Sequence, residues 1–447
     1  MNYMQKTTKE QTVQSYTEAE NYIMKIPKFV PGRTLKDTGR LLGQITGETV
    51  KSSIIHIAGT NGKGSVCAYL CSVIMESGGT AGMFISPHLE TVRERISIGN
   101  EWISEEDFMT VFERVQQAAK AEKERGYSFP SFSEFLFLMA MCFFGQKNPD
   151  YIILETGMGG RLDATNCIAE PKLCVITEIG YDHMQYLGDT IEKIAAEKAG
   201  IIKPGIPVVF VDKRPESTAV LAEYAKKAKS PVIILKKDDI LDVNINNKTI
   251  DFSLHTGYYN YVSLFLDTPA LYQTENAALA AVAAQALMDG RITPEAVRKG
   301  LGAAQWPGRM EEVLPGVYLD GAHNEDGVEA LLYTVRNDGC RGRRFLLFGS
   351  AADKQYDKMI QQIVKAGLFE KAAVTVMESD RSASIDELKM IWEKYKETAY
   401  SFYSDAGEAL LALLADKGRD DIIYIAGSLY LAGQIKSLIR RSQNDRF

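Results

Sequence analysis

The sequence predicts an α/β protein in which a mostly parallel sheet, beginning at a glycine-rich turn, is followed by a smaller Rossmann-like domain. Short apolar runs rich in Val and Ile alternate with longer segments of helical pattern, which is typical of parallel sheets covered by helices. The glycine-rich turn, residues 58–65, lies between the first such run and a helix. The chain has 447 residues, which is too long for one ordinary core, so two domains are expected.

The glycine-rich turn joins an apolar strand over 53–57 to a helix over 66–76. This arrangement suits a phosphate, because backbone N–H groups and the positive end of the helix face the anion. Lys63 adds a charge, and the Ser65 hydroxyl can reach a phosphate or a metal ion. The common P-loop pattern has Ser or Thr where this chain has Gly64. A dinucleotide-binding turn is the alternative, but a lysine inside the turn suits a triphosphate better.

Composition excludes several classes of protein. The net charge of −7 gives no general attraction to nucleic acid or to anionic membranes. The apolar run over 135–144 is too short for a membrane span, and residues 1–6 lack the apolar segment of a secretory signal. The six cysteines show no Cys-x-x-Cys spacing, which favours a reduced compartment. We therefore expect a cytoplasmic protein without nucleic-acid or membrane partners.

The remaining elements of the first domain follow in order. We expect a helical, polar lead-in over 1–50, strands over 82–85, 151–154 and 173–176, helices over 105–124 (with Ser104 as N-cap), 133–147 and 275–288, and small antiparallel strands within 240–266. Cys67 and Cys71 lie on one face of the helix after the turn, as core residues do.

A domain boundary is expected at Gln305-Trp306-Pro307-Gly308-Arg309, because Pro-Gly ends the preceding helix and the pattern then starts again. The predicted division is an N-terminal domain over 1–304, a linker over 305–310 and a Rossmann-like domain over 311–447. Strands of the second domain are expected over 317–319, 345–348, 373–376 and 422–425.

Polar residues follow several of these strands directly. Glu155 comes after one apolar run, and an acid at a strand end beside a triphosphate suits Mg²⁺. Ser86 follows a second strand and His183 a third, so all three face one edge of a parallel sheet. Lys198 ends a helix, where the simplest interpretation is a solvated lysine. Ser86, Glu155 and His183 also have a simpler interpretation, as ordinary polar residues at strand ends.

In the second domain, polar residues also follow two of the predicted strands directly. Asp320-Gly321-Ala322-His323-Asn324 follows one, and Gly427-Ser428-Leu429 follows another, which predicts a crevice facing the first domain. From these residues alone we expect a two-domain enzyme that uses ATP and Mg²⁺. Ligation, phosphoryl transfer to a small molecule and a nucleotide-driven switch all remain open at this point.

The order of motifs resembles the folylpolyglutamate synthase/dihydrofolate synthase family of the Mur ligase superfamily. The resemblance covers about residues 40 to 435 and rests on the following motifs: Gly59-Thr60-Asn61-Gly62-Lys63-Gly64-Ser65, Ser86-Pro87-His88-Leu89, Arg93-Glu94-Arg95-Ile96, Leu154-Glu155, Gly159-Gly160-Arg161-Leu162-Asp163-Ala164-Thr165-Asn166, Asp182-His183, Glu197-Lys198-Ala199-Gly200, Pro307-Gly308-Arg309, Asp320-Gly321-Ala322-His323-Asn324, Asp353-Lys354 and Gly427-Ser428-Leu429. Cell-wall Mur ligases are similar only around the turn, His183 and Lys198.

The resemblance implies an ATP-dependent ligase that joins L-glutamate to the γ-carboxylate of folate through an acyl phosphate. It implies ATP as a substrate, two Mg²⁺ sites and an additional monovalent cation. The implied roles are catalysis for Lys63, Lys198 (as a carbamate) and His323; ATP binding for Gly62, Lys63, Gly64, Ser65, Asn276, Arg309 and Asp320; metal binding for Ser86, Glu155 and His183; folate or pterin binding for Ser131, Leu162, Asp163 and Ala164; and glutamate binding for His323 and Ser428.

Two functional alternatives accompany this expectation. Relatives that also make dihydrofolate from dihydropteroate often carry Asp-Leu-Gly-Leu-Glu-Arg before the first strand, where this chain has Phe29-Val30-Pro31-Gly32-Arg33-Thr34. We therefore expect a polyglutamate synthase, with the bifunctional enzyme as the alternative. An ATP-driven switch belongs to another class and would not need a second domain with its own crevice. We expect a monomer whose partners are its small-molecule substrates.

Overall fold

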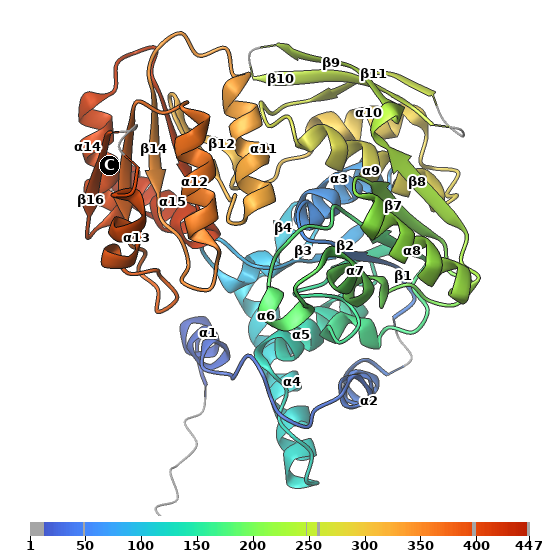
Figure 1. The fold of residues 1–447 in the computed structure, drawn as a ribbon. Coiled ribbons are helices and arrows are strands. Elements are labelled where there is room, and N and C mark those ends of the chain that lie inside the picture. The colour runs from blue at the N-terminus through green and yellow to red at the C-terminus, as the bar shows by residue number, and fades with distance from the viewer. Residues whose placement is uncertain (1–12, 48–49, 247, 257–259, 396–398, 445–447) are drawn as a thin grey trace, which may run out of the picture.

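The computed structural model describes residues 13–47, 50–246, 248–256, 260–395 and 399–444. Within these residues the strands form an eight-stranded sheet, a six-stranded sheet and a three-stranded sheet (Figure 1). The first belongs to the N-terminal part and the second to the C-terminal part, which confirms the predicted fold class. Residues 1–6, where no secretory signal is expected, lie outside the described residues.

The eight-stranded sheet has the order β4-β3-β2-β5-β1-β6-β7-β8. The parallel strands are β1 (Ser53–Ala58), β2 (Ala81–Phe84), β5 (Tyr151–Glu155), β6 (Leu173–Ile176), β7 (Val208–Asp212) and β8 (Val232–Lys236), and the antiparallel edge is β3 (Ile96–Ile98) with β4 (Glu101–Trp102). β1 lies between β5 and β6, so the turn that follows it stands near the middle of the sheet. Ligands of open α/β sheets bind beyond the carboxyl ends of the strands, which is where this turn lies.

Helices cover both faces of this sheet. α3 (Lys63–Glu76), α9 (Gln273–Ala286) and α10 (Pro294–Ala303) pack on one face, while α5 (Phe132–Lys147), α4 (Glu105–Glu124), α2 (Leu35–Thr46) and α1 (Tyr16–Met24) form the layer on the other. α6 (Met184–Leu187), α7 (Ile191–Ala199) and α8 (Pro215–Ala228) pack beside β6 and β7. Phe135 to Phe144 are all buried, as the apolar run predicts, and so are Cys67 and Cys71.

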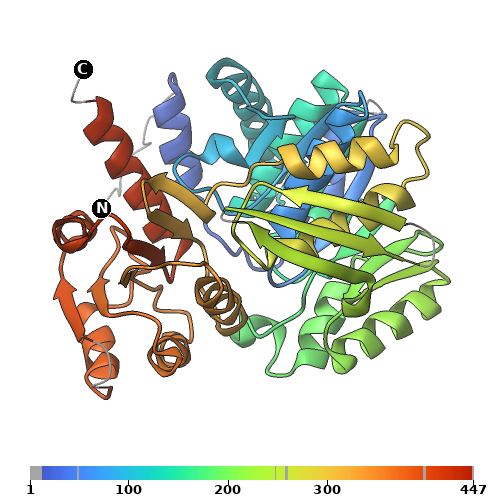
Figure 2. The same ribbon diagram turned by 90° about the horizontal axis from the view of Figure 1, so that it is seen from above.

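The three-stranded antiparallel sheet consists of β9 (Ile240–Asn246), β10 (Thr249–His255) and β11 (Asn260–Leu266). It lies over the α9–α10 side of the N-terminal domain (Figure 2), where its apolar residues Ile250, Phe252 and Leu254 join the core. The expected change to small antiparallel strands is confirmed.

The six-stranded sheet has the order β12-β13-β17-β14-β15-β16 and is parallel except for β12. Its strands are β12 (Arg309–Leu314), β13 (Val317–Asp320), β14 (Arg344–Phe348), β15 (Lys371–Thr375), β16 (Ala399–Tyr403) and β17 (Ile422–Ala426). α11 (Glu325–Arg336), α12 (Tyr356–Ala366) and α13 (Ile385–Trp392) supply one apolar layer, and α14 (Ala406–Asp416) with α15 (Leu429–Asn444) the other.

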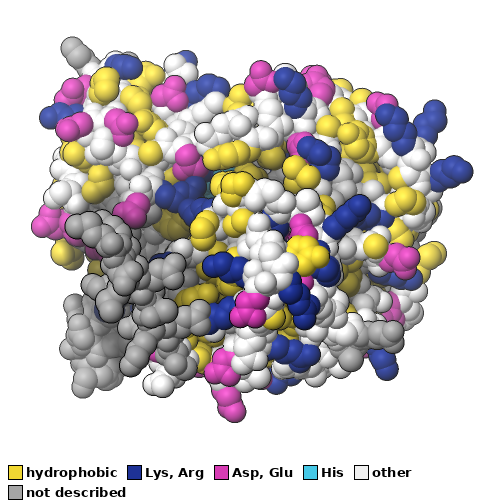
Figure 3. Space-filling view, turned by 90° about the horizontal axis from the view of Figure 1, so that it is seen from below, with side chains coloured by type: hydrophobic (Ala, Val, Ile, Leu, Met, Phe, Trp, Pro, Cys, Tyr) yellow, Lys and Arg dark blue, Asp and Glu magenta, His cyan; other side chains and the backbone are white. Residues whose placement is uncertain are grey.

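The surface carries both signs of charge. Figure 3 shows Lys and Arg side chains spread over the face seen from below, with Asp and Glu side chains among them. No helix in the described part of the chain is long and apolar enough to cross a membrane.

Candidate active site

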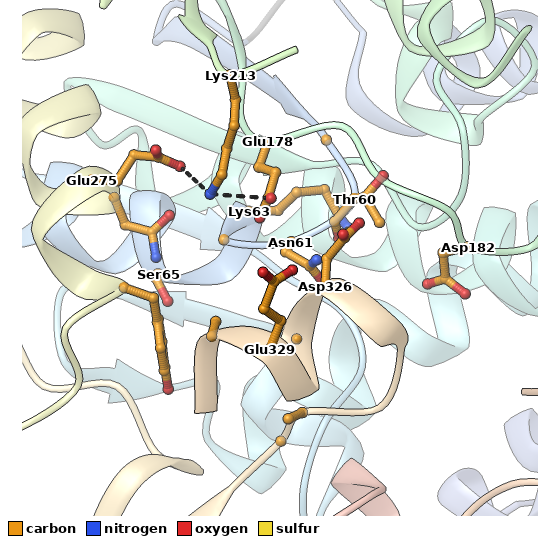
Figure 4. A pocket seen from close by; sticks show the side chains of 18 of the residues that line it. Thr60, Asn61, Lys63, Ser65, Glu178, Asp182, Lys213, Glu275, Asp326 and Glu329 are labelled. Carbon is orange, nitrogen blue, oxygen red and sulfur yellow. Dashed lines mark hydrogen bonds and ion pairs between the residues drawn. The ribbon is translucent and has the colours of Figure 1, made fainter. Parts of the chain in front are cut away.

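A cavity of about 1470 Å³ lies where the edge of the large sheet faces the second domain. The turn after β1, the ends of β2, β5 and β7, and helices α9 and α11 all contribute to its wall. Figure 4 shows the side chains from the turn, α9 and α11 around it. The cavity brings together these predicted site residues: Gly62, Lys63, Gly64, Ser65, Ser86, Glu155, His183, Lys198, Asn276, Arg309, Asp320 and His323.

The turn after β1 needs its glycines. Gly62 has a φ of +85°, and a Cβ at this position would lie 2.1 Å from Asn276 Oδ1. A Cβ on Gly64 would lie 2.4 Å from the Trp306 ring. α3 begins at Lys63, earlier than the predicted start at residue 66, because left-handed Gly62 serves as its N-cap. The first N–H groups of the helix are therefore available to an anion at the turn.

Side chains of α9 hold the turn from the other side. Gln273 Nε2 donates to Ser65 Oγ over 3.1 Å, and Asn276 Nδ2 donates to Gln273 Oε1 over 2.9 Å. Lys63 Nζ donates to the carbonyl oxygen of Thr60 over 3.1 Å, which keeps its charge at the turn. A cationic amine and several N–H groups thus converge on one small volume, as phosphate binding requires.

Glu155 and Ser86 meet at the ends of adjacent strands. The Ser86 N–H donates to Glu155 Oε2 over 2.9 Å, and the carboxylate is buried. Burial raises the pKa of Glu155, whereas the charges of Lys63, Arg309 and Arg95 act in the opposite direction. Among the described residues no group of three or more His, Cys, Asp or Glu side chains could hold a metal ion unaided. An acid and a hydroxyl beside a phosphate cradle nevertheless fit Mg²⁺, which completes its shell with phosphate oxygens and water.

Asp182 joins the two domains through a charged cluster. Lys354 Nζ of the second domain lies 2.6 Å from Asp182 Oδ1, while His183 Nε2 and His323 Nε2 lie 3.7 Å and 3.8 Å from Asp182 Oδ2. Burial lowers the pKa of both histidines to about 4, so their rings are neutral near pH 7. His323 Nδ1 donates to the carbonyl of Gly321 over 2.7 Å, which leaves Nε2 unprotonated and able to accept a proton.

Lys198 is buried, so its interpretation as a solvated lysine at a helix end is wrong. Its Nζ donates to the carbonyl oxygen of Gly59 over 2.7 Å, across from α7 to the glycine-rich turn. Burial, followed by the charge of Lys63, lowers the pKa of Lys198 to about 7. The helix-end position alone could not reveal this, because the burial comes from residues distant in the chain.

The second domain contributes a buried carboxylate at the end of β13. Asp320 Oδ1 accepts the N–H of Ala322 over 2.8 Å, and Oδ2 accepts the N–H of Met310 over 3.1 Å. Tyr272 also donates its hydroxyl to Asp320. Arg309, which begins β12, lines the same side of the cavity.

Several cavity residues escaped prediction. Lys213 Nζ lies between Glu178 (3.1 Å) and Glu275 (3.2 Å), as the dashed lines of Figure 4 show. Arg214 pairs with Asp326 of α11 over 2.5 Å and so links the domains. Both basic residues follow β7, a strand that was not predicted although its run Val208-Val209-Phe210-Val211 is apolar.

Other predicted residues do not line the cavity. Ser131 caps α5 and bonds Glu134, Leu162 is exposed, and Ala164 is buried. Asp163 Oδ2 accepts the N–H groups of Gly157 and Met158, which do line the cavity. Ser428 is buried and accepts the N–H of Tyr430 over 3.1 Å.

Comparison with known families agrees with this geometry. Residues 57–284 match the Mur ligase middle domain, and residues 308–429 match the Mur ligase glutamate ligase domain. The chain is 34% identical to the dihydrofolate synthase/folylpolyglutamate synthase of Bacillus subtilis (strain 168), over 95% of this chain and 99% of that protein.

Solved structures of folylpolyglutamate synthases are also similar to this chain in fold. A Mycobacterium tuberculosis folylpolyglutamate synthase in complex with ADP superposes with a TM-score of 0.86 at 27% identity, covering 95% of this chain and 98% of that one. A folylpolyglutamate synthase in complex with AMPPCP and folate superposes with a TM-score of 0.81 at 28% identity, covering 95% and 100%.

A glycine-rich turn that faces a second α/β domain across this cavity, together with the two Mur ligase domain matches, defines an ATP-dependent ligase of the Mur type. Within that class, the chain belongs to the folylpolyglutamate synthase/dihydrofolate synthase family, as the motifs of the sequence indicate.

Proposed function

We propose that this protein is a folylpolyglutamate synthase, which uses ATP to add L-glutamate to the γ-carboxylate of a reduced folate. The observation that carries the proposal is that the cradle at Lys63 shares one cavity with the His323 side of the second domain. A nucleotide bound on the first domain would thereby meet an amino acid bound on the second. The folate complex of a relative supports the choice of acceptor.

The chemistry follows from these positions. The folate γ-carboxylate attacks the γ-phosphorus of ATP and releases ADP, and the resulting acyl phosphate is then attacked by the α-amine of glutamate. Phosphate leaves and an amide forms, with one proton released from the amine. Phosphoryl transfer depends on positioning and on neutralising charge. Lys63 and the N–H groups at the start of α3 would hold the phosphates, and neutral His323 would accept the amine proton at Nε2.

Nucleotide contacts are proposed for Gly62, Lys63, Gly64, Ser65, Asn276, Arg309 and Asp320. Ser86 and Glu155 would hold one Mg²⁺, and His183 with Glu155 a second. When bound, Mg²⁺ supplies positive charge that stabilises the transferring phosphoryl group. Lys198 is proposed as a carbamate, because its partly neutral amine can react with CO₂ and the product would be an anion beside these residues. The monovalent cation remains an expectation from the family.

Residues outside the cavity are also proposed to bind the substrates. Ser131, Leu162, Asp163 and Ala164 would form the pterin side, and Ser428 with His323 the glutamate side. The division into a domain over 1–304, a linker over 305–310 and a domain over 311–447 also stays a proposal; the two separate sheets support it, although β12 begins at Arg309, within the linker. We also propose a monomeric, cytoplasmic enzyme whose partners are folate, glutamate and ATP rather than nucleic acid.

The second candidate is a bifunctional enzyme that also converts dihydropteroate to dihydrofolate. The identity to the Bacillus subtilis enzyme favours it, whereas the sequence over 29–34 favours the single activity. The test is glutamate-dependent phosphate release from MgATP, measured in parallel with tetrahydrofolate and with dihydropteroate. Release with tetrahydrofolate alone supports the proposal, and release with both supports the bifunctional enzyme. Release with neither, while ATP still binds, contradicts both.

A further inference from the structure

Arg95 is a buried cation that has no acidic partner among the described residues. It ends the short 3-10 helix Val92–Arg95 and is 8% exposed. Its Nε donates to His88 Nδ1 over 2.8 Å, and its guanidinium carbon lies 5.3 Å from the centre of the Phe132 ring. Among the described residues no carboxylate lies within ion-pair distance of Arg95. A buried charge without a counter-ion is costly, which makes such a residue unusual.

The acids near Arg95 are already occupied. Glu94 accepts the N–H groups of Leu89, Glu90 and Thr91 at 2.7, 2.7 and 2.8 Å. Glu155 accepts the N–H of Ser86 and is the proposed metal ligand. The terminal nitrogens of Arg95 make no hydrogen bond within the described part of the chain, and neither is sealed from solvent. Its guanidinium therefore offers a free two-pronged donor.

Arg95 lies between the metal and phosphate side of the cavity and the proposed pterin side. His88, its hydrogen-bond partner, comes two residues after Ser86, which lines the cavity beside Glu155. Phe132, whose ring it faces, follows Ser131 on the proposed pterin side. Tyr430 of the second domain is close enough to raise the pKa of Arg95, although burial lowers that pKa more strongly, so Arg95 lies near the junction of the domains. Arg95 does not itself line the cavity, but its partner His88 directly follows Pro87, which does, so an acceptor that extends from the cavity toward the pterin side would reach this guanidinium.

We propose that Arg95 binds the α-carboxylate of the terminal glutamate of the folate acceptor. This inference rests on the proposed function. A folate has this carboxylate on the same residue as the reacting γ-carboxylate, whereas dihydropteroate has a single carboxylate, which is the reacting one. Guanidinium and carboxylate pair through two parallel hydrogen bonds. Arg95 would thereby favour acceptors that already carry a glutamate, as chain extension requires.

The test pairs a change in the protein with a change in the substrate. Arg95→Gln and Arg95→Lys are compared with wild type on tetrahydrofolate and on its α-carboxamide, with KM and kcat measured separately. We expect wild type to prefer the α-carboxylate in KM by about 10- to 100-fold. Arg95→Gln should lose most of this preference, Arg95→Lys should keep part of it, and the KM for L-glutamate should not change.

Arg93→Gln is the matched control, because Arg93 lies in the same short helix but bonds the carbonyl of Ile103 and pairs with Glu105. It should leave the preference intact. Equal losses on both folates in Arg95→Gln, or a raised KM for L-glutamate in place of folate, would overturn the proposal. Thermal unfolding of each variant checks folding.

If Arg95→Gln does not fold, the wild-type comparison still decides, because equal KM values for the acid and the carboxamide would refute the role of Arg95. That outcome leaves the proposed function intact. Wild type that releases no phosphate with any folate would refute the proposed function, and the role of Arg95 with it.

Discussion

Lys198 Nζ donates a hydrogen bond of 2.7 Å to the carbonyl oxygen of Gly59, the first glycine of the glycine-rich turn. The contact joins the end of α7 to the end of β1 and places a buried amine in the wall of the cavity. Because burial lowers its pKa to about 7, a large part of this amine is neutral at physiological pH. A neutral amine is the form that reacts with CO₂.

The Lys198→Ala variant should be nearly inactive, with kcat lowered by at least about 100-fold because a charge that acts on the transferring group is lost. Small carboxylates such as acetate should restore part of the activity by taking the place of the carbamate. Lys193→Ala is the control, since Lys193 lies on the same helix but is exposed and pairs with exposed Asp189. Full activity of untreated Lys198→Ala would end the carbamate proposal.

Glu155→Gln should lower kcat by about 100- to 1000-fold, because the amide retains an oxygen for the Ser86 N–H but loses the charge that would hold Mg²⁺. The Mg²⁺ concentration at half-maximal rate should also rise. Steady-state kinetics at graded Mg²⁺ measure both effects, with exposed Glu170→Gln as the control. Near-normal turnover at low Mg²⁺ would remove Glu155 from the metal site.

Gly64→Ala should weaken ATP binding by about tenfold or more, because the added methyl group would lie 2.4 Å from the Trp306 ring and displace either the turn or the indole. Gly43→Ala is the control: Gly43 also lies in a helix, α2, but among the described residues nothing apart from its chain neighbours and the backbone of its own helix lies within 4 Å of the place that its added methyl group would take. Titration calorimetry with ATP compares the two. Equal affinities would show that the turn tolerates a side chain.

His56 predicts a pH dependence of stability. It is fully buried on β1, its Nε2 lies 2.7 Å from Thr165 Oγ1, and burial lowers its pKa from 6.5 to about 3. Below pH 6.5 the unfolded chain binds the proton and the folded chain does not. Protonation therefore favours unfolding, and the free energy of unfolding falls by up to about 1.4 kcal/mol per pH unit between pH 6.5 and 3.

Urea titrations at several pH values measure this slope. Other groups titrate in the same range, so the informative quantity is the difference between wild type and His56→Asn, which should be less stable near pH 7 but should lose less stability on acidification. Parallel pH profiles for the two proteins would contradict the assignment.

The sequence could predict the fold class and most parallel strands because their apolar runs are local signals. It also predicted which strand ends carry polar residues, and parallel connection then brings Ser86, Glu155 and His183 to one edge. The start of α3 at Lys63 was missed because a left-handed Gly62 serves as its cap in place of a side chain. The burial of Lys198 and the pairing of Asp182 with Lys354 depend on segments far apart in the chain, which no local pattern contains.

The central claim is that the folate γ-carboxylate is activated as an acyl phosphate. The measurement that tests it most directly traces the carboxylate oxygen into the released phosphate. Tetrahydrofolate labelled with ¹⁸O in the γ-carboxylate is incubated with the enzyme, MgATP and L-glutamate, and the released phosphate is analysed by mass spectrometry. If the carboxylate is activated as an acyl phosphate, one labelled oxygen passes to phosphate in each turnover. Phosphate without label, formed together with the glutamylated product, would contradict this account.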